Sequence, residues 1–201
     1  MNIAELINHI NPKNYPKGAL VLGNGESINL INPLSKWLLE DYLLIGVNRI
    51  GYKLQPHILF IGDPPFNDPI IRTTHPQYYV TNQKYPWDFN PDQTFEFEEG
   101  QRDPPLQNLR LNTILDLSYD SPYMAIQLAY KIGFRKIYLL GVDYTPNHFY
   151  KEDGDHQCID NFEFIDKAYS HLFTVLSNEG IILRNLSPKS RLTGIPQLVA
   201  I

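Results

Sequence analysis

The chain of 201 residues has a single cysteine, Cys158, no lysine or arginine run and no long apolar segment. One cysteine cannot form an internal disulfide, so we expect a reducing, cytoplasmic setting. Lys and Arg number 17 against 22 Asp and Glu, and this net charge of −5 argues against nucleic acid as a partner. Apolar runs such as 137–142 are far shorter than the about 20 residues of a membrane span, and the N-terminal residues lack a signal-peptide pattern.

What the chain does contain is enough apolar residues for a core. Hydrophobic residues make up 43% of the sequence, which excludes wholesale disorder. The length suits one domain over residues 1–201. With 16 prolines and 13 tyrosines, we expect that domain to carry long, proline-punctuated loops.

Short, continuously apolar segments alternate with segments of helical period. This order is typical of a parallel sheet covered on both faces, so we predict an α/β fold with a Rossmann-like, mostly parallel sheet and helices on both faces. The predicted strands are 19–22, 43–47, 57–61, 78–81, 136–141 and 181–184, and the predicted helices are 3–10, 31–42, 121–132 and 161–178.

Residues 82–118 differ in character, with four prolines, several acidic residues and no clear helical period. The segment is too short for a core of its own. We therefore expect an insertion or lid with some irregular strand, and no separate domain.

Ligands of such sheets bind beyond the carboxyl ends of the strands, so the loops there are the place to search. Gly23, Asn24 and Gly25 follow the first predicted strand, and Ser27 comes just after them. Glycines permit close backbone approach, and a helix N-terminus offers unpaired N–H groups to an anion such as a nucleotide phosphate. The third glycine of the dinucleotide fingerprint is missing. An ordinary strand-to-helix turn capped by Ser27 is the alternative.

Three further loops begin with polar residues. Asn48 follows the second predicted strand and can bind ribose or phosphate, or simply form a turn. Asp63 follows the third predicted strand and can face a ligand or metal, or be a turn carboxylate fixed by the two prolines that follow it. Ser121, followed by Pro122, is predicted as the N-cap of a helix and as a second anion site.

The loop after 136–141 is the richest in groups that move protons. Gly141 and Asp143 open it as candidate ligand-binding residues, and Tyr144, Tyr150 and His156 follow. Tyrosine can donate to a leaving phosphate, and histidine is the usual general base near neutral pH. The chain has no tight metal-ligand motif, so we expect no metal site.

Taken in order, several of these patches resemble the bacterial sialyltransferases with a single Rossmann-like domain. They also resemble a broader group that includes the 6-hydroxymethylpterin diphosphokinase-like proteins. The patches are LGNGES at 22–27, GVNR at 46–49, FIGDP at 60–64, the stretch from SPYMAI to LLGVDY at 121–144, and HFY at 148–150.

The resemblance implies roles for single residues. Asn24 and Asn48 would bind a cytidine nucleotide, and Ser121 would contact the carboxylate of the donor sugar. Tyr150, with Tyr144 near the second tyrosine position, would assist the leaving phosphate.

The resemblance further makes His156 the general base, with no metal or other cofactor required. The implied partners are a CMP-type nucleotide sugar and a glycan or small-molecule acceptor.

Two alternatives stay open. The resembling sialyltransferases have asparagine where this chain has Asp63, and a carboxylate there would repel an anionic donor or require a metal or a proton. One alternative is therefore an ATP- and Mg²⁺-dependent diphosphokinase-like phosphoryl transferase with Asp63 or Asp143 near the metal. The other is a non-catalytic nucleotide- or sugar-binding module. A homo-oligomer is compatible with every reading.

Overall fold

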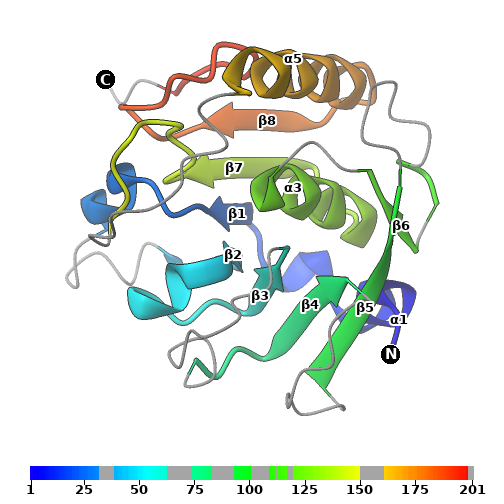
Figure 1. Cartoon of the computed structure of the whole chain (residues 1–201). Helices are drawn as coiled ribbons and strands as arrows, with labels where there is room; N and C mark the ends of the chain where they lie inside the picture. The colour runs from blue at the N-terminus through cyan, green and yellow to red at the C-terminus, as the bar shows by residue number, and fades with distance from the viewer. Residues whose placement is uncertain are drawn as a thin grey trace.

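The computed structural model of this chain describes residues 1–31, 39–62, 74–82, 93–100, 109–111, 113–116, 120–149 and 161–198. Within them lies one sheet of eight strands, and every neighbouring pair is parallel. The predicted α/β class with a parallel sheet is confirmed (Figure 1). The strands are β1 (Gly18–Leu22), β2 (Tyr42–Val47), β3 (Ile58–Ile61), β4 (Tyr78–Asn82), β5 (Thr94–Glu99), β6 (Ile114–Leu115), β7 (Lys136–Leu140) and β8 (Ile182–Asn185).

The strand order is β6-β5-β4-β3-β2-β1-β7-β8. The chain therefore runs outward from β1 to β6 and then returns to place β7 on the other side of β1. Adjacent loops after β1 and β7 leave in opposite directions, which makes this pair the topological switch point of the sheet. A ligand is expected there.

The sheet separates two cores because strand side chains alternate between its faces. In β1, Ala19 and Val21 belong to one buried cluster, whereas Leu20 and Leu22 belong to the other. The continuously apolar strands follow from burial on both sides.

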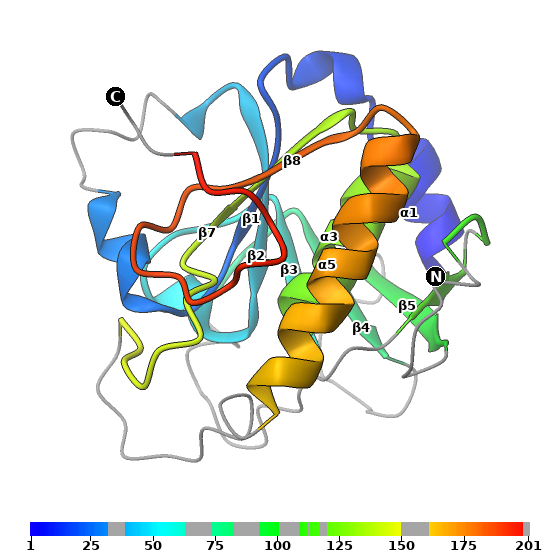
Figure 2. The ribbon, with the colours of Figure 1, turned by 90° about the horizontal axis from the view of Figure 1, so that it is seen from above.

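The α-helices of the described ranges pack on the first of these faces, and Figure 2 shows them together on one side of the strands. The second face is covered in part by short 3-10 helices. The helices are α1 (Ile3–His9), η1 (Pro12–Asn14), η2 (Glu26–Leu30), η4 (Asn48–Tyr52), α3 (Ser121–Ile132) and α5 (Phe162–Asn178). None of the helices in the described ranges is long and apolar enough to cross a membrane.

The start of α3 corrects one prediction. Its N-cap is Asp120, whose side chain accepts a hydrogen bond from the N–H of Tyr123, so Ser121 is the first helical residue. Three adjacent residues, Asp, Ser and Pro, all suit a helix start, and the proline tolerates either of the first two helical positions. The helix ends at Ile132 as predicted, with Gly133 as its C-cap.

Two other segments differ from expectation. Thr94–Glu99 lies in the segment predicted as an insertion with irregular strand, yet it forms a regular strand that pairs with β4, and β6 extends the sheet further. The rest of that segment includes residues outside the described ranges, and its role as a lid stays a prediction. The predicted helix 31–42 falls mainly on residues 32–38, also outside them, and Tyr42 belongs to β2.

Candidate functional site at the carboxyl ends of β1, β2, β3 and β7

Backbone hydrogen bonds join the loops after β1 and β7 at the switch point. The N–H of Gly23 donates to Leu140 O at 2.8 Å, and the N–H of Gly25 donates to Gly141 O at 2.7 Å. A Cβ on Gly23 would lie 2.3 Å from the carbonyl oxygen of Gly141. Glycine at this position therefore permits close approach of the two loops to each other.

Asp143, in the loop after β7, binds the start of η2. Its Oδ2 accepts a hydrogen bond of 2.7 Å from the N–H of Ser27, across 116 residues of sequence. The expectation that this helix start offers unpaired N–H groups to an anion is thus wrong for Gly25 and Ser27, whose N–H groups bind this chain's own oxygens.

The loops after β1 and β7 nevertheless hold polar atoms without a partner. Among the described residues, the buried atoms Asn24 Oδ1, Ser27 Oγ and Asp143 Oδ1 have no hydrogen-bond partner. Buried polar atoms are usually satisfied, so three such atoms in two adjoining loops call for an explanation. Two of the three belong to side chains that can only accept at that atom, and they suit N–H or O–H donors of a ligand.

Asn48 joins the ends of β2 and β3 to the start of α3. Its Oδ1 accepts from the N–H of Gly62 at 3.2 Å, and its Nδ2 donates to Ser121 Oγ at 3.2 Å. Asn48 has φ 48°, a left-handed conformation that asparagine adopts more readily than most residues. Two residues predicted separately as nucleotide and donor ligands, Asn48 and Ser121, are therefore in direct contact.

Gly62 allows this approach between β3 and α3. A Cβ there would lie 2.3 Å from Ser121 Oγ. The next residue, Asp63, lies outside the described residues, as do Tyr150 and His156. Their predicted roles stay predictions.

The described chain before Tyr150 lies against the turn after β1. Phe149 donates its N–H to Asn24 O at 3.0 Å, and His148 forms a backbone bridge with Gly25. The loop after β7 thus returns to the switch point directly before Tyr150.

Tyr144 has a different environment from the one that its predicted role requires. Its hydroxyl donates to Asp120 Oδ2 at 2.7 Å and lies 3.1 Å from the hydroxyl of Tyr169. Burial, followed by the charge of Asp120, raises the pKa of Tyr144 well above its usual value. To reach a leaving phosphate, this hydroxyl would have to release Asp120.

The described part of the C-terminal tail packs against the loop after β7. Ser187 Oγ accepts from the N–H of Val142, and Ser190 Oγ donates to Val142 O. Lys189 pairs with Glu26 at 2.9 Å. No spacing rule links these residues in the sequence, because only the β1-β7-β8 order brings them together.

Among the described residues, no group of three or more His, Cys, Asp or Glu side chains is arranged to hold a metal ion. The phosphoryl-transfer alternative places Asp63 or Asp143 near Mg²⁺. Of these two residues, Asp143 lies within the described ranges, and its Oδ2 already accepts a hydrogen bond from the N–H of Ser27.

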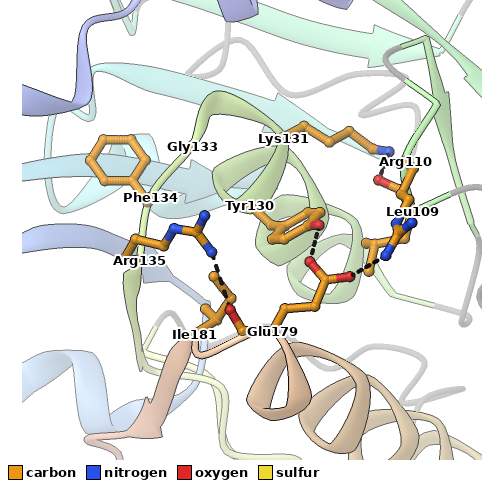
Figure 3. A pocket seen from close by; sticks show the side chains of 9 residues that line it. All are labelled: Leu109, Arg110, Tyr130, Lys131, Gly133, Phe134, Arg135, Glu179 and Ile181. Atoms are coloured by element: carbon orange, nitrogen blue, oxygen red, sulfur yellow. Dashed lines mark hydrogen bonds and ion pairs between the residues drawn. The ribbon is translucent and has the colours of Figure 1, made fainter.

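A cavity of about 340 Å³ lies at the amino ends of β7 and β8, between the carboxyl-terminal ends of α3 and α5 (Figure 3). Its polar groups are largely paired with one another. Tyr130 donates to the Glu179 carboxylate, Arg110 pairs with the same group at 3.4 Å, and Arg135 donates to Glu179 O at 3.2 Å. None of the residues that line this cavity belongs to the loops at the switch point, so the two places are separate.

A parallel sheet whose strand order reverses between β1 and β7 defines a doubly wound α/β domain. The likeness to solved structures is more specific, because it shows a sialyltransferase-like fold. No protein-family model matches the chain, and neither does any curated protein in a comparison of sequences.

The sialyltransferase CstII from Campylobacter jejuni in complex with cytidine-5'-monophosphate aligns with 92% of this chain and 85% of its own, at a TM-score of 0.58 and 15% identity. Its complex with CMP-3FNeuAc aligns with 92% of this chain and 86% of its own, at 0.54 and 15%. The monofunctional alpha-2,3-sialyltransferase Cst-I, also from Campylobacter jejuni, aligns with 91% of this chain and 80% of its own, at 0.52 and 15%.

Proposed function

We propose that this protein is a sialyltransferase-like glycosyltransferase that takes its sugar from a CMP-type donor without a metal ion. The observation that carries the proposal is the contact between Asn48 and Ser121 at the carboxyl ends of the strands, within a sialyltransferase-like fold. Solved structures of that fold hold CMP, and one holds a trisaccharide acceptor as well. They support a nucleotide sugar and a glycan as the partners of this chain.

Neutral groups would bind most of the donor's charge in this acidic chain. Lys189 pairs with Glu26, and the Arg191 guanidinium lies 4.3 Å from the ring centroid of Phe162. Amide and hydroxyl donors that are fixed in place stabilise an anion without reorganisation. Asn48 and Ser121 fit this description, because each fixes the other.

The reaction itself would involve Tyr150 and His156, which come after the described part of the loop that follows β7. The acceptor hydroxyl attacks the anomeric carbon, His156 takes the proton of that hydroxyl, and the bond from the anomeric carbon to the CMP phosphate breaks. Tyr150 donates a hydrogen bond to the departing phosphate. General acid–base groups of this kind contribute about 10²–10⁴-fold to a rate.

The test is release of CMP from CMP-sialic acid in the presence of an oligosaccharide acceptor and EDTA. Tyr150→Phe and His156→Ala should each lower the rate by about a hundredfold or more. His171→Ala, a histidine on α5, is the matched control and should keep the wild-type rate. Phosphoryl transfer from ATP that needs Mg²⁺, with no release of CMP, would contradict the proposal.

A further inference from the structure

Asp120 is a buried carboxylate that accepts hydrogen bonds from three separate elements. Within α3, Tyr123 donates its N–H to Oδ1 at 2.7 Å. From α5, the hydroxyl of Tyr169 donates to the same oxygen at 2.8 Å, and from the loop after β7, the hydroxyl of Tyr144 donates to Oδ2 at 2.7 Å. We call Asp120, Tyr144 and Tyr169 the Asp120 cluster.

The two tyrosine hydroxyls of this cluster are permanent donors. Burial, followed by the charge of Asp120, raises the pKa of Tyr144 and that of Tyr169 well above the usual value. Both hydroxyls therefore stay protonated at neutral pH. Hydrogen bonds to an ionised carboxylate are about twice as strong as those between neutral groups. The cluster thus joins the start of α3 to α5 and to the loop after β7.

Ser121, the residue after Asp120, has little room to move. Its Oγ accepts a hydrogen bond from Asn48 Nδ2 at 3.2 Å, the upper end of the usual range for an N–H···O bond. A Cβ on Gly62 would lie 2.3 Å from the same oxygen, so Ser121 already lies against the backbone at the end of β3. Movement of Ser121 away from Asn48 breaks the hydrogen bond, and movement towards Gly62 is blocked.

The position of Ser121 depends on the cap of its helix. The first N–H groups of a helix have no partner inside it, so a cap is needed to hold the first turn. Asp120 provides this cap, and Ser121 is the first residue of α3. Whatever holds the Asp120 carboxylate therefore also holds the Ser121 side chain.

The backbone of Tyr144 shows that the cluster is constrained from the side of β7 as well. Its φ is 54°, a left-handed conformation that is rare for an aromatic residue. Such a conformation persists only where the surrounding structure imposes it. Tyr144 donates through its hydroxyl to Asp120 at 2.7 Å, and its carbonyl oxygen accepts from Arg191 at 3.3 Å. Both of its polar ends are thus held where the loop meets Asp120.

We infer that the Asp120 cluster positions Ser121 against Asn48 and Gly62, so that α5 and the loop after β7 set the geometry of the site at the start of α3. Asp120, Tyr144 and Tyr169 are positioning residues in this account, because they act through Ser121. The use of this geometry for a CMP-type donor rests on the proposed function, whereas the positioning of Ser121 does not.

The first test measures the positioning without a ligand. The amide of Tyr123 donates to Asp120, and its hydrogen exchange, followed by nuclear magnetic resonance, reports on the first turn of α3. The amide of Leu128, further along the same helix, is the internal reference and removes any change in global stability. Relative to it, the Tyr123 amide should exchange about threefold faster or more in Tyr169→Phe than in the wild type.

Tyr130→Phe is the matched control for this measurement. It is the same change on α3, and it removes a tyrosine–carboxylate bond at the other end of the helix (Figure 3). Its exchange ratio should equal that of the wild type. An equal ratio in Tyr169→Phe and Tyr130→Phe would overturn the inference, whatever the protein binds.

The second test asks whether Tyr169 acts on a ligand through Ser121. Calorimetry with the substrate analogue CMP-3FNeuAc should show about fivefold weaker binding or more in Tyr169→Phe, and a change within about twofold in Tyr130→Phe. In a Ser121→Ala background, Tyr169→Phe should have no further effect, because residues that act through one contact are not additive. Asp120→Asn keeps a good N-cap and an acceptor for Tyr169, so its loss should be smaller than that of Tyr169→Phe.

The outcomes of the second test separate this inference from the proposed function. A purely structural role for Tyr169 would lower the melting temperature and leave the affinity at the Tyr130→Phe value, and that result would overturn the inference. The same loss with and without Ser121 would overturn it as well. A wild-type protein that binds no CMP-3FNeuAc would refute the proposed function, and hydrogen exchange at Tyr123 would still decide the positioning.

Discussion

Gly23→Ala is the substitution that most severely perturbs the switch point. The added Cβ would lie 2.3 Å from the carbonyl oxygen and 2.7 Å from the carbonyl carbon of Gly141. Both atoms are backbone, so the loops after β1 and β7 would have to separate by about 1 Å to restore ordinary contact. That movement strains the hydrogen bonds from Gly23 to Leu140 and from Gly25 to Gly141.

The cost can be worked from these contacts. Overpacking costs about 1–3 kcal/mol, and each of the two weakened hydrogen bonds adds about 0.5–1.5 kcal/mol, which gives about 2–6 kcal/mol in total. At this chain length, 1 kcal/mol lowers the melting temperature by about 2–4 °C, so the expected loss is about 4–24 °C.

Thermal unfolding followed by circular dichroism measures this loss. Gly180→Ala is the control, because Gly180 has nothing within 4 Å of an added Cβ and a φ of +75°. Its cost is limited to left-handed strain of about 1–2 kcal/mol. If Gly23→Ala melts within 2 °C of the wild type, the close approach of the two loops does not exist and the reasoning fails.

Three other predictions concern single side chains. Asn48→Gly keeps the left-handed backbone and loses the hydrogen bonds to Gly62 and Ser121, so CMP should bind at least tenfold more weakly in calorimetry; unchanged affinity would remove Asn48 from the site. Asp120→Ala removes the N-cap of α3 and leaves two tyrosine hydroxyls without their acceptor, which should cost about 2–4 kcal/mol in urea unfolding, and a cost below 1 kcal/mol would contradict the described contacts. Burial lowers the pKa of Lys131 from 10.5 to about 8. At a pH between these two values, Lys131 therefore binds a proton in the unfolded chain and does not in the folded chain. Stability of the wild type relative to Lys131→Met should therefore rise as the pH increases from about 8 to about 10, and parallel melting curves of the two proteins against pH would refute this.

The strands of the central sheet could be predicted from the sequence because each is a continuous apolar run. β1, β2 and β3 are buried on both faces, so their composition alone distinguishes them. β5 alternates apolar and acidic residues and lies towards one edge of the sheet. Its pattern is that of a half-exposed strand, and the prolines and acidic residues around it obscure that signal.

The sequence pointed to the strand ends as the place to search for a site, but the contacts among the candidate residues could not be derived from spacing. The contact of Asn48 with Ser121 spans 73 residues, and that of Ser27 with Asp143 spans 116. Only the placement of β7 beside β1 brings the second pair together. Asp120 was overlooked because the neighbouring Ser-Pro pair is itself a good helix start.

The central claim is that this fold binds a cytidine nucleotide with neutral donors and no metal. The most direct measurement is a thermal-shift panel of CMP, CDP, UMP, GMP and ATP, run in EDTA and again in Mg²⁺. CMP at a hundred times its dissociation constant should stabilise the protein by about 2.7 kcal/mol, which raises the melting temperature by about 5–10 °C in both buffers. A shift with ATP that EDTA abolishes, or no shift with CMP at millimolar concentration, would contradict the account.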